Sequence, residues 1–241
     1  GNGFWSRDRG FESLIPSQMQ QFEKRPRWSL FVIIPIVIPS VNNSQAAAIE
    51  AKSANWVQYL EELAGEIHKE GVSSFYLLKV ASLWASTFAY VEWLVCFYER
   101  KTFPKADQVA SVLKDAWGWD EDLARLFWKS GRHPFAHVGQ ANTFHSYEKY
   151  KGLDTNVSFD VNSWSSAVTD DWDKYHTYKA AAVLPPLELE GQNIQIVYFH
   201  HQMMRSELLP ALSKLVADGI RSETSEQKLR DIIELNSQIL H

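Results

Sequence analysis

Arg132 and His137 are the residues of this chain whose types and spacing are best suited to acid–base chemistry. They stand in the segment Gly-Arg-His-Pro-Phe-Ala-His-Val-Gly at residues 131–139, in which His133 directly follows the arginine. An arginine is permanently charged and a histidine titrates near neutral pH, so the pair suits proton transfer on a phosphodiester. The spacing alone is common by chance, and the surrounding sequence has to support the prediction.

The residues between the two side chains predict how the backbone presents them. Gly131 is expected to end the preceding helix, and Pro134 is suited to the first position of a new helical turn. His133 would then be extended, with His137 one turn later. We therefore expect Arg132 and His137 on the same side of a helix start, where free backbone N–H groups favour an anion.

The charge around this segment agrees with an anionic ligand. Residues 125–151 carry five basic side chains against one acidic side chain, a local charge of +4 in a chain of net charge -5. Aromatic residues lie among them, and this mixture is typical of sites for single-stranded nucleic acid. The candidate RNA-binding residues are Arg125, Lys129, Lys149 and Lys151. The alternative is a solvated basic helix end in which Arg132 caps carbonyls or pairs with a carboxylate of the bundle.

The pattern resembles the signature of the HEPN superfamily (higher eukaryotes and prokaryotes nucleotide-binding domains). The matching residues are Arg132, the polar His133 after it, His137, and Gly139 just beyond. The resemblance covers the helical core at about residues 44–145, with a further bundle helix supplied from the C-terminal part. It implies a four-helix core.

The resemblance also implies a function, that of a metal-independent endoribonuclease or RNA-binding domain. Two subunits of a homodimer would bring their motifs together, so that His137 transfers the proton of the ribose 2′-hydroxyl and Arg132 holds the phosphate. His133 would be a supporting polar group. Glu92 is a further candidate, because family members often carry an acidic residue on a preceding helix. Gly139 stands where antitoxin-paired members have a tyrosine, which argues against that form of regulation, although a protein regulator remains an open alternative.

Other chemistries have less support in the sequence. His200 and His201 are adjacent and should point in different directions, which is poor geometry for joint metal ligation. No glycine-rich phosphate loop, Gly-x-Ser-x-Gly motif or Cys-His arrangement stands out. We expect neither a metal nor a cofactor, and we expect the partner to be RNA or a nucleotide. A second class of function is a non-catalytic helical interaction or nucleotide-sensing module in which Arg132 is structural.

Composition predicts the class of protein and its compartment. A chain of 241 residues with 45% hydrophobic residues can bury a sizeable core. Its single cysteine, Cys96, lies in an apolar run and is expected to be a buried, inert thiol. One cysteine allows no intramolecular disulfide, which fits a reducing, cytoplasmic environment. We expect an extended N-terminal arm at residues 1–43 and one helical domain at 44–241 with an insertion at about 146–200.

Two apolar stretches raise the question of a membrane. Residues 30–38 resemble a signal-peptide core, yet Pro35 interrupts this apolar run and Pro39 directly follows it. We therefore expect an extended segment that packs on the body of the protein or at a subunit contact. Residues 80–98 are long enough to span a bilayer, but small residues dilute them and Glu92 would cost about 3 kcal/mol on insertion scales. We expect the buried central helix of a bundle and no stable membrane insertion.

Periodicity predicts a mainly α protein, a helical bundle with a small β-hairpin and an irregular insertion. Helices are expected at about 44–69, from 73 or 74 to 101, and over 105–130 with a break at Gly118. Residues 146–186 lack periodicity and suggest an irregular insertion. Residues 187–198 alternate around Gly191 and predict a hairpin. Two further helices are expected at about 206–218 and 225–240.

Overall fold

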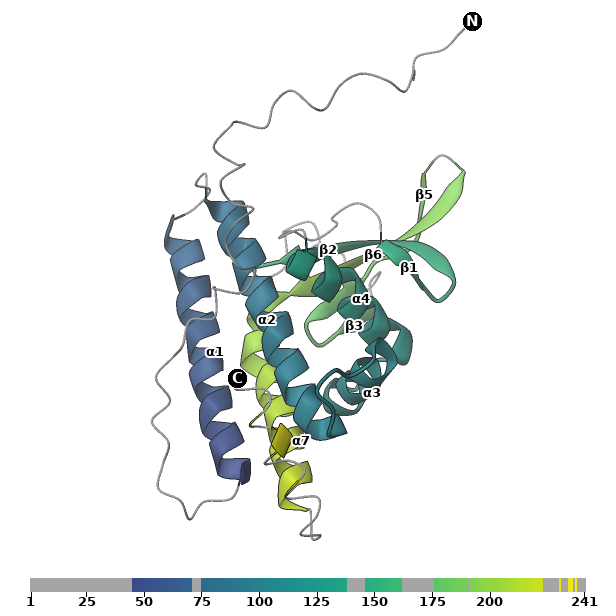
Figure 1. The fold of residues 1–241 in the computed structure, drawn as a ribbon. Coiled ribbons are helices and arrows are strands. Elements are labelled where there is room, and N and C mark those ends of the chain that lie inside the picture. The colour runs from purple at the N-terminus through teal and green to yellow at the C-terminus, as the bar shows by residue number, and fades with distance from the viewer. Residues whose placement is uncertain are drawn as a thin grey trace, which may run out of the picture. The chain divides into compact units, whose positions relative to one another are not determined.

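The computed structural model describes residues 45–70, 75–137, 146–161, 176–189 and 191–222, together with residues 230, 234, 235 and 237. Four helices come first within these ranges (Figure 1): α1 (Gln45–Glu70), α2 (Tyr76–Glu99), α3 (Ala106–Trp117) and α4 (Glu121–His137). The expected N-terminal arm, with its apolar run at 30–38, lies outside the described residues, as does most of the helix expected at 225–240.

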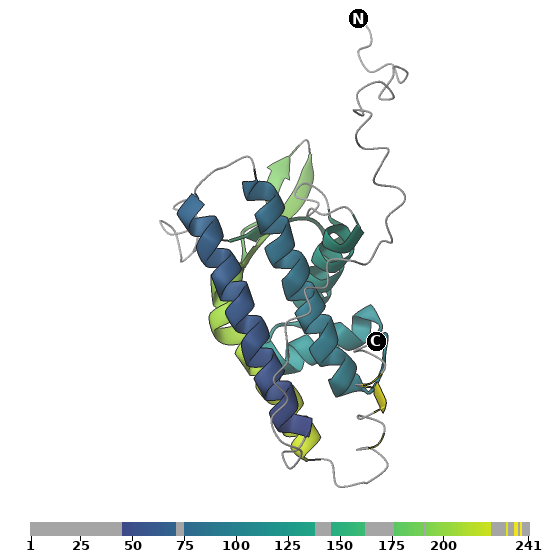
Figure 2. The same ribbon diagram turned by 60° about the vertical axis from the view of Figure 1, so that its left-hand side comes forward.

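Helices α1, α2 and α7 (Leu209–Arg221) run beside one another, with α1 in front of α7 in Figure 2. Helix α1 buries Ile49, Leu60 and Ile67 and exposes Glu61 and Glu62 on its other side, which confirms its amphipathic pattern.

Helix α2 is the central helix, because it contacts α1, α3, α4 and α7 and is apolar on several sides. Two thirds (67%) of its most apolar 18-residue window is buried. Among the described segments it alone has the length and composition to cross a membrane, a criterion that a buried core helix also meets. Cys96 is buried on this helix, and burial raises the pKa of its thiol to about 11, so the thiol stays protonated at neutral pH.

The helical run that follows the sheet starts earlier than the periodicity predicts. It begins at the end of the sheet with α6 (His201–Met203), passes through a π-helical segment, η3 (Met204–Leu208), and continues as α7. Pro210 lies in the first turn of α7, directly after this π-helical segment. The wider π-turn changes the hydrogen-bond register just where the proline lacks a donor, so the helix continues through it.

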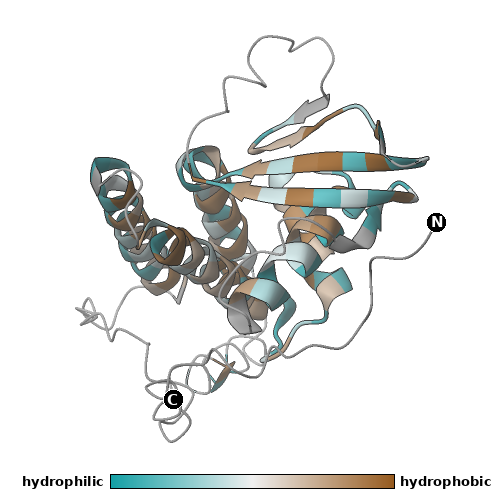
Figure 3. Ribbon diagram, turned by 90° about the horizontal axis from the view of Figure 1, so that it is seen from above, coloured by the Kyte–Doolittle hydropathy of each residue, from teal (hydrophilic) through white to brown (hydrophobic). Residues whose placement is uncertain are grey.

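Six strands form one mixed sheet: β1 (Ser146–Tyr150), β2 (Leu153–Asp160), β3 (His176–Tyr178), β4 (Ala181–Val183), β5 (Leu187–Leu189) and β6 (Gln192–His200). The strand order is β1-β2-β6-β4-β3, and β5 also pairs with β6. Strands β2 and β6 are parallel, whereas the other pairs are antiparallel. Along the two long strands, apolar and polar residues alternate (Figure 3).

The sheet confirms one prediction and corrects another. The hairpin of β5 and β6 turns at Gly191, whose φ of 78° is a left-handed conformation that glycine adopts without strain. The expectation of an irregular insertion at 146–186 is wrong for residues 146–160, 176–178 and 181–183, which form strands. These strands are short or half polar, and the longest of them, β2, pairs with β6 about forty residues later, so local periodicity did not show them. The protein is thus mainly helical, with a six-stranded mixed sheet.

Helix α4 corrects the expected break before Arg132. The helix neither ends at Gly131 nor restarts at Pro134, because it is continuous from Glu121 to His137 with the proline inside it. A β-carbon at Gly131 would lie 2.5 Å from Cε2 of Phe88 and 2.8 Å from Cζ of Phe159. The glycine therefore serves the close approach of α4 to α2 and β2, and does not stop the helix.

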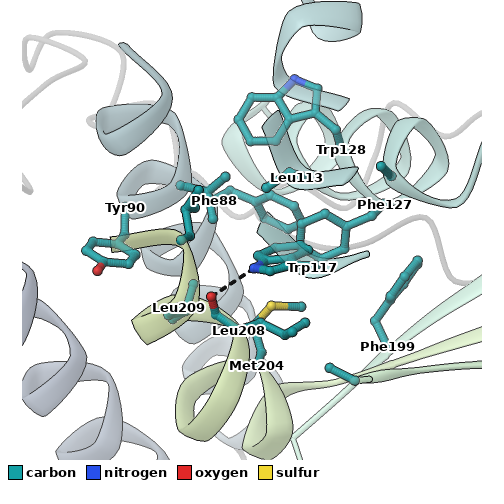
Figure 4. Close-up of a cluster of buried hydrophobic side chains, with 14 of the residues drawn as sticks. Phe88, Tyr90, Leu113, Trp117, Phe127, Trp128, Phe199, Met204, Leu208 and Leu209 are labelled. Atoms are coloured by element: carbon teal, nitrogen blue, oxygen red, sulfur yellow. Dashed lines mark hydrogen bonds between the residues drawn. The ribbon is translucent and has the colours of Figure 1, made fainter. Parts of the chain in front are cut away.

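Aromatic rings fill the core between the helices and one face of the sheet (Figure 4). Phe127 of α4 packs edge-on against Phe199 of β6, with ring centroids 5.0 Å apart. Trp117 of α3 donates a hydrogen bond from Nε1 to the carbonyl oxygen of Leu208, at 2.8 Å. This bond ties the end of α3 to the π-helical segment, so the core fixes both elements.

Candidate functional site

The guanidinium group of Arg132 is held by the carboxylate of Glu92. Nη2 lies 3.1 Å from Oε1 and 3.2 Å from Oε2, and Nε lies 3.3 Å from Oε2. The side chains are 36% and 26% exposed, respectively, so the pair lies at the surface between α4 and α2. It compensates the only charged side chain of the apolar stretch 80–98, which explains how Glu92 is tolerated there.

The two histidines of the motif are placed by the continuous helix α4. Successive residues of an α-helix are about 100° apart, so Cα positions five residues apart, as at Arg132 and His137, differ by roughly 140° around the axis. His133 and His137 are four residues apart and share a face of the helix. The expectation that a turn started by Pro134 brings Arg132 and His137 to one side is therefore wrong, because their Cα positions lie on different faces of the continuous helix. His133 is exposed, and the side chain of His137 lies outside the described part of the chain.

Two of the predicted RNA-binding residues, Arg125 and Lys129, share one face of α4 with Arg132, at spacings of four and three residues. Arg125 pairs with three carboxylates, at 2.9 Å from Glu121, 3.2 Å from Asp107 and 3.5 Å from Asp122. Lys129 also has an interaction within the structure. This face of α4 therefore carries a row of basic side chains, and carboxylates pair with Arg125 and Arg132.

The other two predicted RNA-binding residues lie on the β1–β2 hairpin. Lys149 pairs with Asp154 at 3.3 Å, and Lys151 lies 3.8 Å from Asp120 and 5.0 Å from the ring centre of Tyr150. The tertiary structure thus brings acidic residues from elsewhere in the chain to the segment whose linear charge is +4. The local sequence charge overstates the positive potential that an RNA would meet.

Asp120 connects the start of α4 to the sheet, a role that sequence reasoning missed. Its Oδ1 accepts a hydrogen bond from the backbone N–H of Leu123 at 2.8 Å, the geometry of a helix N-cap. Its Oδ2 accepts from the hydroxyls of Tyr150 at 2.7 Å and Tyr178 at 3.0 Å. Burial, followed by the hydrogen bonds to Tyr178 and Asp120, raises the pKa of Tyr150. The aspartate before a helix restart was the available signal, but its tyrosine partners are distant in sequence.

His200 and His201 diverge at the junction of β6 and α6. His201 is fully buried, its Nε2 lies 2.7 Å from Oγ1 of Thr87, and its ring packs edge-on against Trp84 at 4.8 Å. Burial, with a smaller contribution from the charge of Arg205, lowers its pKa well below the usual value. His201 is therefore a neutral core residue at physiological pH.

His200 lies beside a carboxyl group, that of Asp160. It is the register partner of Asp160 in the parallel pair β2–β6, and its charge lowers the pKa of Asp160, which burial raises more strongly. Within the described ranges, no three His, Cys, Asp or Glu side chains converge on a point where a metal ion would bind.

Comparisons of the chain with models of known protein families, with curated proteins and with solved structures found no match.

Proposed function

We propose that this protein binds RNA at the surface around Arg132 and His137 and cleaves it without a metal ion, as a HEPN-like endoribonuclease. One observation carries the proposal: the pair of Glu92 and Arg132 fixes a guanidinium group at the surface of α4, the helix that also bears both histidines of the motif. Glu92 occupies the fork of Nε and Nη2, so a phosphate would be contacted by the other edge of the guanidinium group.

The roles of the residues follow from the chemistry of RNA cleavage. His137 takes the proton of the ribose 2′-hydroxyl, whose oxygen then attacks the neighbouring phosphorus atom. The bond to the 5′-oxygen breaks, a second acid protonates that oxygen, and a 2′,3′-cyclic phosphate forms. Arg132 stabilises the charge that develops on the phosphate, Glu92 orients Arg132, and His133 supports the phosphate contact.

The second acid comes from a second copy of the chain under this proposal. Arg132 and His137 differ by roughly 140° around the axis of α4, so one helix does not direct both toward a single phosphate without a bend in the substrate or another subunit. A homodimer that joins two copies of α4 supplies the missing histidine. The proposal places this RNA-cleaving dimer in the cytoplasm, with a protein regulator as an additional partner.

A second candidate function is a non-catalytic interaction module in which Arg132 is structural. It is favoured by the carboxylates that pair with Arg125, Arg132, Lys149 and Lys151 and leave little uncompensated positive charge. An ion pair that joins α4 to α2 has a structural use of its own, since removal of one partner leaves the other partly buried without compensation.

Cleavage of a fluorescent single-stranded RNA in EDTA separates the two candidates. The proposal expects cleavage by the wild-type protein, loss of cleavage but retained binding in His137→Ala, and loss of both in Arg132→Ala. His68→Ala is the matched control, because His68 is exposed on α1 and belongs to no proposed site. Undiminished cleavage by His137→Ala in a preparation of unchanged fold would contradict the assignment. Failure of the wild-type protein to bind RNA would favour the interaction module.

A further inference from the structure

Three large apolar side chains are exposed at the start of α2. Phe75, directly before the helix, is 64% exposed, and Leu77 and Leu78 in its first turn are 78% and 63% exposed. Within the described ranges five large hydrophobic side chains are exposed, and these three lie within four consecutive residues. Single exposed hydrophobic residues are ordinary, whereas a cluster of them marks a surface that interacts with a partner.

The helix geometry makes these side chains a tip rather than a face. The helical hydrogen bonds begin at the carbonyl oxygen of Phe75, which accepts from the N–H of Lys79 at 2.9 Å. Side chains of an α-helix lean toward its N-terminus, so those of the first turn point past the end of the helix. At about 100° per residue, Phe75 and Leu77 lie roughly 160° apart around the axis, with Leu78 between them. We call these three residues the apolar tip.

Basic side chains lie directly behind the apolar tip. Helix α1 ends at the end of the bundle where α2 begins (Figures 1 and 2), and Lys69 is exposed in its last turn. Lys79 of α2 lies one turn after Phe75, and its Nζ is 3.7 Å from Oε2 of Glu66 on α1. At about 1.5 Å per residue, the backbone of Lys79 lies about 6 Å behind that of Phe75. Apolar side chains ahead of lysines are typical of elements that dock in the interface of a membrane, where the long lysine side chains reach the head groups.

The size and shape of the apolar tip decide between a protein partner and a lipid surface. Its three side chains together expose roughly 400 Å², about half of what one partner buries in a stable protein interface. A protein partner packs on one side of a helix and would leave either Phe75 or Leu77 in water. Lipid acyl chains surround the end of a helix, so they take up all three side chains at once.

We propose that the apolar tip docks this protein reversibly on a phospholipid membrane. Phe75, Leu77 and Leu78 enter the boundary between head groups and acyl chains, and Lys69 and Lys79 lie at the level of the lipid phosphates. The offset of about 6 Å fits the depth of about 5–10 Å to which interfacial elements sink. Helix α2 stays in the bundle, because 67% of its most apolar window is buried inside the protein, so the contact is peripheral. The inference goes beyond the proposed RNA chemistry and does not depend on it.

Co-sedimentation of the full chain with phosphatidylcholine vesicles tests the proposal. The wild-type protein should bind, and Leu77→Gln combined with Leu78→Gln should lower the partition coefficient at least about ten-fold, because apolar surface no longer leaves water. Glutamine keeps the helix propensity, so this double variant should unfold at the Tm of the wild type. Leu77→Met combined with Leu78→Met keeps the apolar surface and should bind like the wild type. Phe103→Gln is the matched control, because Phe103 is 84% exposed beyond the other end of α2, and its binding should be unchanged.

The inference would be overturned if the wild-type protein stayed in the supernatant, or if the double glutamine variant bound vesicles as tightly as Phe103→Gln. Binding that required phosphatidylserine and disappeared in about 0.5 M NaCl would assign the contact to basic residues, which also overturns it. Light scattering tests for a protein partner. If the double glutamine variant turned a dimer into a monomer and the wild type bound no vesicles, the apolar tip would be a contact between copies of the chain. Loss of RNA cleavage in His137→Ala bears only on the proposed ribonuclease, so the two proposals fail independently.

Discussion

Replacement of Gly131 by alanine tests whether α4 approaches α2 as closely as the structure indicates. Alanine in a helix interior is normally more favourable than glycine by about 0.5–1 kcal/mol. At this position, however, the added methyl group would lie 2.5 Å from Cε2 of Phe88, and nearer still to its Cζ. Phe88 is 2% exposed and packs against Trp84, so its ring has no free space into which to move.

Overpacking of this kind costs about 1–3 kcal/mol, which exceeds the gain in helix propensity. We expect Gly131→Ala to lower the free energy of unfolding by about 1–2 kcal/mol after that gain is subtracted. Gly65→Ala is the matched control, because Gly65 is also inside a helix and a methyl group added there would meet nothing within 4 Å. That variant should be more stable than the wild type by about 0.5–1 kcal/mol.

Urea unfolding followed by circular dichroism measures both variants. Opposite signs are expected, with a difference of about 1.5–3 kcal/mol between them, or roughly 3–12 °C in Tm for a domain of this size. If Gly131→Ala were as stable as Gly65→Ala, the close contact between α4 and Phe88 would be wrong. The position of Arg132 beside Glu92, which depends on this approach, would then need revision.

Two further predictions concern stability. Because the pKa of His201 is low in the folded protein, the unfolded chain takes up a proton at this residue below about pH 6.5 and the folded protein does not. The free energy of unfolding should therefore fall by about 1.4 kcal/mol for each pH unit below that value. Urea unfolding between pH 5 and 7.5 should show this pH dependence in the wild type and in His68→Gln, and a weaker pH dependence in His201→Gln. Equal slopes in all three proteins would refute the assignment to His201. Asp120→Asn weakens the acceptor for Tyr150 and the helix cap together, which should cost about 2–3 kcal/mol and lower the pKa of Tyr150. Denaturant unfolding and spectrophotometric tyrosine titration measure these effects, and an unchanged pKa would argue against the hydrogen bond.

Much of the helical part of the fold was predictable from the sequence, because a helix is stabilised by neighbours three and four residues away. The predicted helix at 44–69 corresponds to α1, and the prediction from 73 or 74 to 101 corresponds to α2. The hairpin at 187–198 was equally local, since Gly191 marks its turn and the residues on either side alternate. Strand β2 was missed because it pairs with β6, about forty residues later, which no local pattern can reveal. Strand β1 pairs with β2 through a local turn at Gly152, so this hairpin had a sequence signal that the prediction of an irregular insertion missed.

The candidate site was predictable in its residue types but not in its surroundings. One alternative from the sequence was that Arg132 pairs with a carboxylate of the bundle, and the structure shows such an ion pair, with Glu92 as the partner. It also brings Asp107 to Arg125 and Asp120 to Lys151, so the charge counted along the chain does not give the charge at the surface.

By itself, the sequence determined the mainly helical class, the buried character of α2, the β5–β6 hairpin and the residue types available for acid–base chemistry. Each of these depends on composition or on contacts between residues close in the chain. The tertiary structure alone decided that α4 continues through Gly131 and Pro134, that six strands form a mixed sheet, and which carboxylate faces each cation. The physical reason is that packing and ion pairing act between atoms close in space, and the free energy of those distant contacts overrides local preferences such as a glycine stop.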